Sequence, residues 1–170
     1  MKRHFFLIWC VVGLVCAAQA QSRVTLDIPP LPAGKGAGVH SPNSPVAPLP
    51  DRADVVPWSL LSQVKMRDVR TGPRPVFSQA QLALQFRLQR IQGFMMPLEP
   101  GESQKHFLLT SVPLTCAFCI PGGPESMVEV FTQTPVKYTL APVVVEGKLA
   151  VLVDDPFGLY YRITHAVSVK

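Results

Sequence analysis

The chain has 170 residues, and its sixteen Lys and Arg against eleven Asp and Glu give a formal charge of +5. Hydrophobic residues make up 48% of the chain and charged residues 16%, with eighteen prolines and four cysteines. Charged residues are fewer than the usual ~25%, and proline is about twice its usual ~5%, which excludes a coiled coil, an all-helical bundle and a polyanion-binding tail protein. We therefore expect one domain with an additional segment.

Residues 1–20 have the pattern of a secretory signal peptide. A basic start precedes the apolar stretch 5–18, whose fourteen residues are fewer than the ~20 that span a bilayer. Ala18-Gln19-Ala20 supplies the small residues of a cleavage site. We expect cleavage after Ala20, a periplasmic location and no membrane span in the mature chain.

Residues 21–57 have the composition of a Pro-rich flexible linker. They hold eight of the eighteen prolines, which prevents a helix or a central strand. We expect an extended spacer that is dispensable for folding, because it has too little apolar periodicity to bury surface. Residues 58–170 then form the domain, and their number is normal for a single domain.

Two short helices are expected at the start of this domain. The first follows Pro57, where apolar residues recur at helical spacing. The second covers 79–84 and is capped by Ser78. Between them, the basic stretch 67–75 is expected to be a solvent-exposed loop.

The rest of the domain predicts β-strands. The apolar alternation that begins at Phe86 changes parity at Ile91, which predicts a bulge before Gly93. Shorter strands are expected at 107–110 and 127–132.

Two further strands complete the domain. Apolar residues of one parity mark a strand over 143–153, with a bend at Gly147. A turn at 154–158 leads to a final strand over 159–169, in which His165 shares the apolar face and is expected in the core. Bent strands with little helix predict a mainly β fold, a small OB-like barrel of five to six strands with one or two short N-terminal helices. A small β-sandwich is the alternative.

Cys116 and Cys119 form the stretch whose residue types carry chemistry, and three interpretations are open. The pair could close a structural disulfide. It could bind a soft metal such as zinc or copper, with His106 as a third ligand. A thiol–disulfide redox site would need Cys116 at a helix N-terminus, which the following Pro121-Gly122-Gly123-Pro124 disfavours.

Other candidate groups have simpler explanations. Met95 and Met96 are expected to fill core gaps rather than to bind copper. Asp154 and Asp155 are expected to form a turn before Pro156. No G-x-S-x-G, H-E-x-x-H or phosphate-loop motif occurs, so we expect a non-enzymatic protein with no certain cofactor. Export and the lack of a basic-aromatic stripe argue against nucleic acid as a partner.

Several motifs lie along residues 58–169, namely Gly93-Phe94-Met95-Met96-Pro97-Leu98-Glu99, Phe107-Leu108-Leu109, Cys116-x-x-Cys119, Pro124-Glu125, Val128-Glu129-Val130 and Val143-x-Val145-x-Gly147-x-Leu149. Together they resemble an uncharacterised family of exported bacterial proteins, the family of domain of unknown function 3299. The resemblance implies a small periplasmic domain with an accessory role in ABC-type envelope transport or in metal handling.

We therefore expect an exported, periplasmic accessory or binding protein of the cell envelope, with an envelope transport complex as its partner. The alternatives are a thiol–disulfide redox protein that uses Cys116 and Cys119, and a purely structural or interaction domain.

Overall fold

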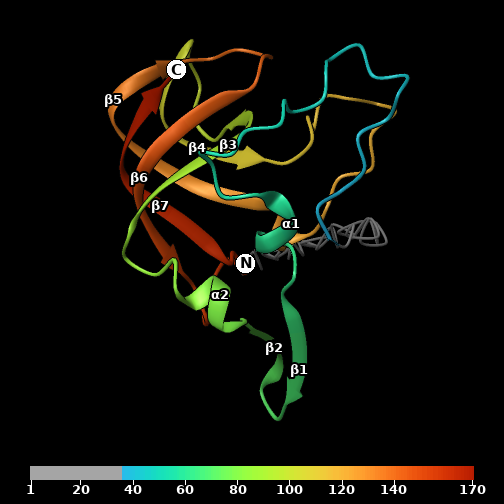
Figure 1. Cartoon of the computed structure of the whole chain (residues 1–170), viewed down its shortest axis with the longest axis vertical. Helices are drawn as coiled ribbons and strands as arrows, with labels where there is room; N and C mark the ends of the chain where they lie inside the picture. The colour runs from blue at the N-terminus through green and yellow to red at the C-terminus, as the bar shows by residue number, and fades with distance from the viewer. Residues whose placement is uncertain (1–35) are drawn as a thin grey trace, which may run out of the picture. The chain divides into compact units, whose positions relative to one another are not determined.

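A computed structural model describes residues 36–170 (Figure 1). The predicted signal peptide and the first part of the predicted linker lie outside the described residues. The elements in chain order are α1 (Trp58–Leu61), β1 (Lys65–Val69), β2 (Gly72–Val76), α2 (Gln79–Leu82), β3 (Leu88–Pro97), β4 (Ser103–Thr110), the 3-10 turn η1 (Pro124–Ser126), β5 (Met127–Lys137), β6 (Val143–Val151) and β7 (Tyr161–Val169). None of the helices among these residues is long and apolar enough to cross a membrane.

Five strands close a barrel in the order β3-β4-β5-β7-β6. Neighbouring strands run antiparallel except for β5 and β7, which run parallel. The prediction of a mainly β fold, a small OB-like barrel with two short helices, is confirmed. The core inside this barrel contains fifteen buried apolar residues that come from every barrel strand, from α1 and from the segment between β2 and α2: Leu61, Phe77, Ile91, Met95, Phe107, Leu109, Val128, Val130, Val136, Val145, Leu149, Val151, Tyr161, Ile163 and Ala166.

β3 is bent where it passes from one neighbour to the next. Residues 88–93 pair with β6 and residues 94–97 pair with β4, and neither ladder contains a register shift. The predicted bulge is therefore wrong. The bend occurs at Gly93, where a Cβ would lie 2.7 Å from both Leu109 and the Thr110 carbonyl oxygen. Ile91 points into the core, so the side chains of the opposite parity point outward. Leu88 and Phe86 have that opposite parity and are therefore exposed.

The predicted loop at 67–75 is instead a β-hairpin. β1 and β2 pair antiparallel with each other, from Lys65 opposite Val76 to Val69 opposite Gly72. They form a separate two-stranded sheet that projects away from the barrel (Figure 1). Alternating charged and proline residues concealed this hairpin in the sequence, because they lack the apolar alternation of a half-buried strand.

The predicted helix over 79–84 is present as the shorter α2. Ser78 accepts a hydrogen bond from the Gln81 backbone, and the Gln81 side chain accepts one from the Ser78 backbone. These two bonds form a capping box, which confirms Ser78 as the N-cap.

His165 does not lie in the core, so that prediction is wrong. The β6–β7 register shifts between Glu146 and Lys148, and His165 takes a positive φ of 54° there. Its side chain is exposed, and Ala166 occupies the inward position instead. Gly147 faces this irregularity, and a Cβ on it would lie 2.8 Å from the Thr164 carbonyl oxygen.

The described half of the predicted flexible linker, residues 36–57, lies against the barrel; we call it the strap. It carries no long helix or strand, yet its polar groups are bound at several points. The Val56 amide donates to the Arg90 carbonyl at 2.8 Å, and the Gln92 side chain donates to the Pro50 carbonyl at 3.1 Å. Proline prevents regular structure in the strap but not docking, so its described part is not a free spacer.

Candidate functional site

Cys116 and Cys119 form a disulfide with their Cα atoms 5.4 Å apart. The bond closes a turn in which the Cys119 amide donates to the Cys116 carbonyl at 3.2 Å, and the Cys116 amide donates to the Pro113 carbonyl at 3.1 Å. Cys116 is buried and Cys119 is half-buried. No helix begins at the pair, because a proline- and glycine-rich stretch follows it, so no helix dipole acts on Cys116.

The predicted metal set of Cys116, Cys119 and His106 is not brought together. Among residues 36–170, no group of three or more His, Cys, Asp or Glu side chains is placed to hold a metal ion. His106 lies on the wall of the barrel in β4, where its Nε2 is 2.9 Å from Glu129 Oε1 and its ring stacks on Phe131 at 4.2 Å. The zinc or copper interpretation therefore lacks its third ligand in this part of the chain.

The partner of His106 belongs to a chain of charged groups across β4, β5 and β7. The buried Glu129 also accepts a hydrogen bond at 2.5 Å from Arg162, which in turn bonds Asp155 at 3.1 Å. Burial acts to lower the pKa of Arg162, but the hydrogen bond and charge of Glu129 outweigh it and raise that pKa. Asp155 also accepts from the Phe157 amide, as expected of a turn former. These contacts give the buried Glu129 carboxylate a cationic partner in Arg162. They also explain the position of His106 as a hydrogen-bond partner of Glu129.

The loop around the disulfide exposes large apolar side chains. Phe118 is 62% exposed and Ile120 59% exposed, with Leu114 before them and Val39 of the strap beside them. We call these four residues the disulfide-loop surface. They are held firmly, because Val39 and Ile120 exchange backbone hydrogen bonds of 2.8 and 2.9 Å.

Glycines allow the strap and this loop to approach closely. Gly38 has a φ of +76°, and a Cβ on it would lie 2.8 Å from the Gly122 nitrogen. A Cβ on Gly122 would lie 2.2 Å from the Gly36 carbonyl oxygen. Nearby, the Gly36 amide donates to Glu125 at 2.6 Å. The glycines at 36 and 38 do not form a phosphate loop. They are explained by the close contact of the strap backbone with the backbone of the disulfide loop.

An apolar cavity of about 60 Å³ lies next to the same loop. Pro113, Leu114 and Thr115 form one side of it, and the end of β3 with the segment 138–140 forms the other. Met95 is buried in the core as predicted, whereas Met96 is partly exposed and lines the cavity.

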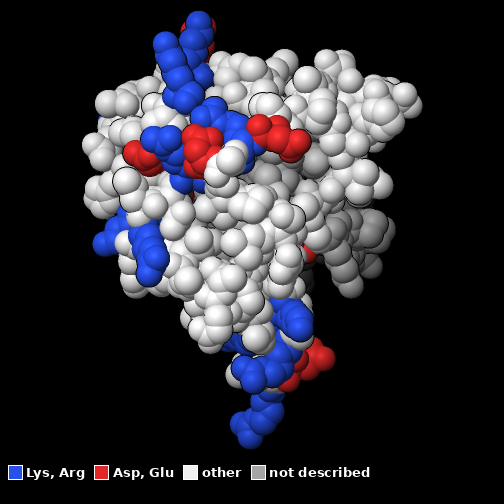
Figure 2. Space-filling view, in the orientation of Figure 1, with Lys and Arg blue, Asp and Glu red and all other residues white. Residues whose placement is uncertain are grey.

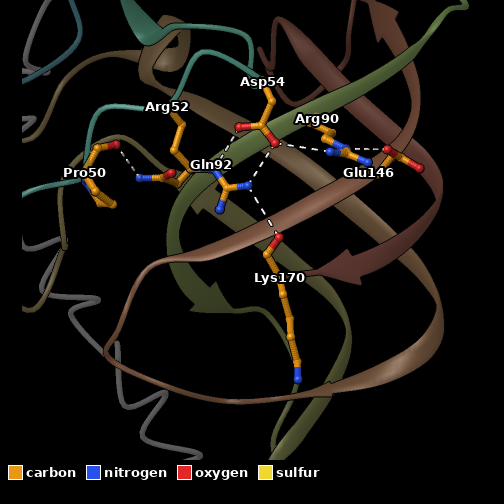
Figure 3. Close-up of polar contacts among 7 residues, drawn as sticks. All are labelled: Pro50, Arg52, Asp54, Arg90, Gln92, Glu146 and Lys170. Carbon is orange, nitrogen blue, oxygen red and sulfur yellow. Dashed lines mark hydrogen bonds and ion pairs between the residues drawn. The ribbon is translucent and has the colours of Figure 1, made fainter.

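A second group of side chains, missed in the sequence, ties the strap to the barrel (Figure 3). Asp54 accepts from Arg52 at 2.8 Å and from Arg90 at 3.1 Å, and Arg90 also bonds Glu146 at 2.5 Å. The Arg52 hydrogen bond is the main reason why the pKa of Asp54 lies well below its usual range. Arg52 also reaches the Lys170 carbonyl at 3.4 Å. Arg52 and Asp54 are neighbours in the chain, but their contacts with Arg90, Glu146 and Lys170 join residues distant in sequence, so no local spacing reveals the whole group.

No protein-family model matches the chain, and no curated protein matches it. A solved structure, that of a DUF3299 family protein from Pseudomonas aeruginosa PAO1, is similar with a TM-score of 0.41 and 20% sequence identity, covering 78% of this chain and 91% of that chain. The sequence motifs resemble the same family.

Proposed function

We propose that the protein is an exported binding protein of the cell envelope, which works in the periplasm as an accessory to an envelope transport complex. The observation that carries this proposal is the disulfide between Cys116 and Cys119, because such bonds persist in oxidising compartments. The signal-peptide pattern of residues 1–20 and the family resemblance support the same location.

The disulfide-loop surface is the contact region in this proposal. Exposed apolar side chains on a soluble domain are typical of a surface that another protein covers. Phe118 and Ile120 lie on a loop fixed by a disulfide on one side and by the strap on the other. A partner would therefore meet a preformed surface, and little conformational entropy would be lost on binding.

Site-specific photo-crosslinking in the periplasm of the source organism tests this proposal. A photoreactive phenylalanine analogue at position 118 should give a discrete crosslinked product with an envelope protein. The same analogue at position 157 is the matched control, because Phe157 is 83% exposed but lies in the turn before β7. Equal products at both positions, or no product at 118, would contradict the proposed contact region. The intact mass of the purified protein should be that of a chain that begins at Gln21 and carries Cys116 and Cys119 as a disulfide.

A thiol–disulfide redox protein is the second candidate. It is favoured by the greater exposure of Cys119, which is half-buried and flanked by the exposed Phe118 and Ile120, whereas Cys116 is buried. A redox protein should turn over a dithiol substrate, and Cys119→Ser alone should abolish turnover. A binding protein should show no turnover of the dithiol substrate. The crosslink at position 118 should nevertheless form in a buffer without reductant.

A further inference from the structure

We propose that the outer edge of β1 is a strand-addition site for an extended, acidic segment of a partner polypeptide. The site is separate from the disulfide-loop surface and does not depend on it. It lies on the projecting β1–β2 hairpin, where Figure 2 shows Lys and Arg side chains gathered at the lower end of the molecule.

The prolines of β2 determine which backbone groups of the hairpin are unpaired. Met66 lies opposite Pro75 and Asp68 lies opposite Pro73. Proline has no N–H, so these cannot be the residue pairs that exchange two hydrogen bonds in an antiparallel ladder. The N–H and C=O groups of Met66 and Asp68 therefore point to the outer edge of β1. No described residue outside the hairpin forms a backbone hydrogen bond with them.

The two edges of the hairpin are consequently different. Pro73 and Pro75 occupy the outward positions of β2 and remove its donors, which is a common protection of an edge strand. β1 has no proline, so its edge keeps alternating donors and acceptors. An extended peptide can pair with such an edge, and a lipid surface or a folded anionic patch cannot match that alternation.

The charge of the hairpin selects the kind of peptide. Residues 65–76 hold four basic side chains and one acidic side chain, a formal charge of +3. Arg67 lies directly opposite Arg74, and like charges in this position destabilise a sheet. Arg74 is paired with Asp154, whereas Lys65, Arg67 and Arg70 have no acidic partner among residues 36–170. A second copy of this edge would bring like charges together, so an acidic segment is the occupant that fits.

The opposite face of the hairpin is already in use. Met66 points toward the segment before β7, where the Tyr160 hydroxyl contacts its sulfur at 3.2 Å. Since side chains alternate between faces, Lys65, Arg67 and Val69 share the other, exposed face. A bound strand would place its acidic residues beside Lys65 and Arg67.

The test uses the whole mature protein and an acetylated, amidated peptide of alternating Thr and Glu as the probe. NMR titration should shift the amides of Met66 and Asp68 first, and a peptide with Lys in place of Glu should not bind. Arg67→Glu should weaken binding about tenfold, while Arg87→Glu, the same charge change at an exposed position outside the hairpin, should leave it unchanged.

A pair of substitutions at Asp68 separates strand addition from simple charge attraction. Asp68→Ala and Asp68→Pro remove the same charge, but only the proline variant loses the outward N–H. Asp68→Pro should bind at least about fivefold more weakly than Asp68→Ala, with the melting temperatures of the two variants confirming that both fold. Equal binding by these variants would overturn strand addition. Binding to vesicles of anionic phospholipid but not to the peptide would overturn the polypeptide as occupant, and the absence of any peptide binding would overturn the site itself.

Discussion

Tyr161 is the largest fully buried side chain of the barrel. Its hydroxyl donates to the Leu61 carbonyl at 2.8 Å and accepts from Gln81 Nε2 at 3.0 Å. One side chain thus joins β7 to both α1 and α2. Burial raises the pKa of Tyr161, so the neutral phenol stabilises the fold below about pH 10, and this stabilisation is lost as the pH rises through the raised pKa.

We predict that Tyr161→Phe lowers the free energy of unfolding by about 1–3 kcal/mol, because it removes a buried hydroxyl with two partners. Urea denaturation monitored by tryptophan fluorescence measures this loss. Tyr138→Phe is the matched control, since the half-buried Tyr138 hydroxyl has no hydrogen-bond partner among the described residues. Equal losses in the two variants would mean that the hydrogen bonds of Tyr161 contribute nothing.

Asp54 makes the attachment of the strap sensitive to acid. Its pKa is lowered in the folded protein, so its ion pairs stabilise the fold above its unfolded pKa of about 4 and are lost as the pH falls toward the folded pKa. We predict that Asp54→Asn melts at a lower temperature than the natural protein at pH 7, and that the difference narrows progressively as the pH falls below about 4 toward the lowered pKa of Asp54. Asp51→Asn should show no difference at either pH. A difference for Asp54→Asn that persists in acid would rule out the carboxylate as its cause.

At the scale of the elements, sequence periodicity predicts the helices and strands that pack on the core. It does not predict the exposed segments correctly. The one-parity pattern of 143–153 and the cap at Ser78 correspond to β6 and α2, because a buried face and a capped helix end leave local signals. Phe86 was assigned to the apolar face of a strand but is exposed. Such an error arises because barrel curvature, which the local sequence does not encode, decides which parity faces inward.

Gly147 lies where the register between β6 and β7 shifts, and we predict that it cannot be replaced without cost. Gly147→Ala should destabilise the protein by about 1–3 kcal/mol, since the new methyl group would press on the Thr164 carbonyl and on Ala166. Lys148→Ala, at the exposed neighbouring position, should be nearly neutral. Thermal unfolding of the two variants checks the difference. A Gly147→Ala variant as stable as the natural protein would contradict this prediction, because β6 and β7 would then be able to change their pairing to accommodate the methyl group.

At the scale of the whole molecule, the structure decides between interpretations that the sequence leaves open for the cysteine pair and for His106. The disulfide was one of three interpretations of Cys116 and Cys119, and spacing alone could not choose among them. The sequence predicts His106 as a third metal ligand, but the β4–β5 register places it beside Glu129 and Phe131 instead. Long-range strand pairing, which no local pattern encodes, decides the outcome for His106, whereas the disulfide closes a local turn.

The strap gives the corresponding prediction. A chain that starts at Trp58 should melt roughly 10 °C or more below one that starts at Gly36, since several hydrogen bonds worth about 0.5–1.5 kcal/mol each are lost together. The chain from Gly36 is the control, and it should melt close to the full chain. Similar melting of both truncated chains would restore the linker interpretation.

The parallel pairing of β5 with β7 has a consequence for how the molecule is assembled. The barrel closes only when β7 has entered between β5 and β6, and the strap contacts side chains that face outward from the closed wall. During synthesis, the strap emerges before β3, whose side chains it contacts, and long before β7, which completes the barrel. Folding is dominated by contacts distant in sequence, which places it among slow, millisecond-to-second reactions. In that interval the strap is protected from extended pairing with the wrong strand, because its prolines lack the N–H that a strand ladder needs.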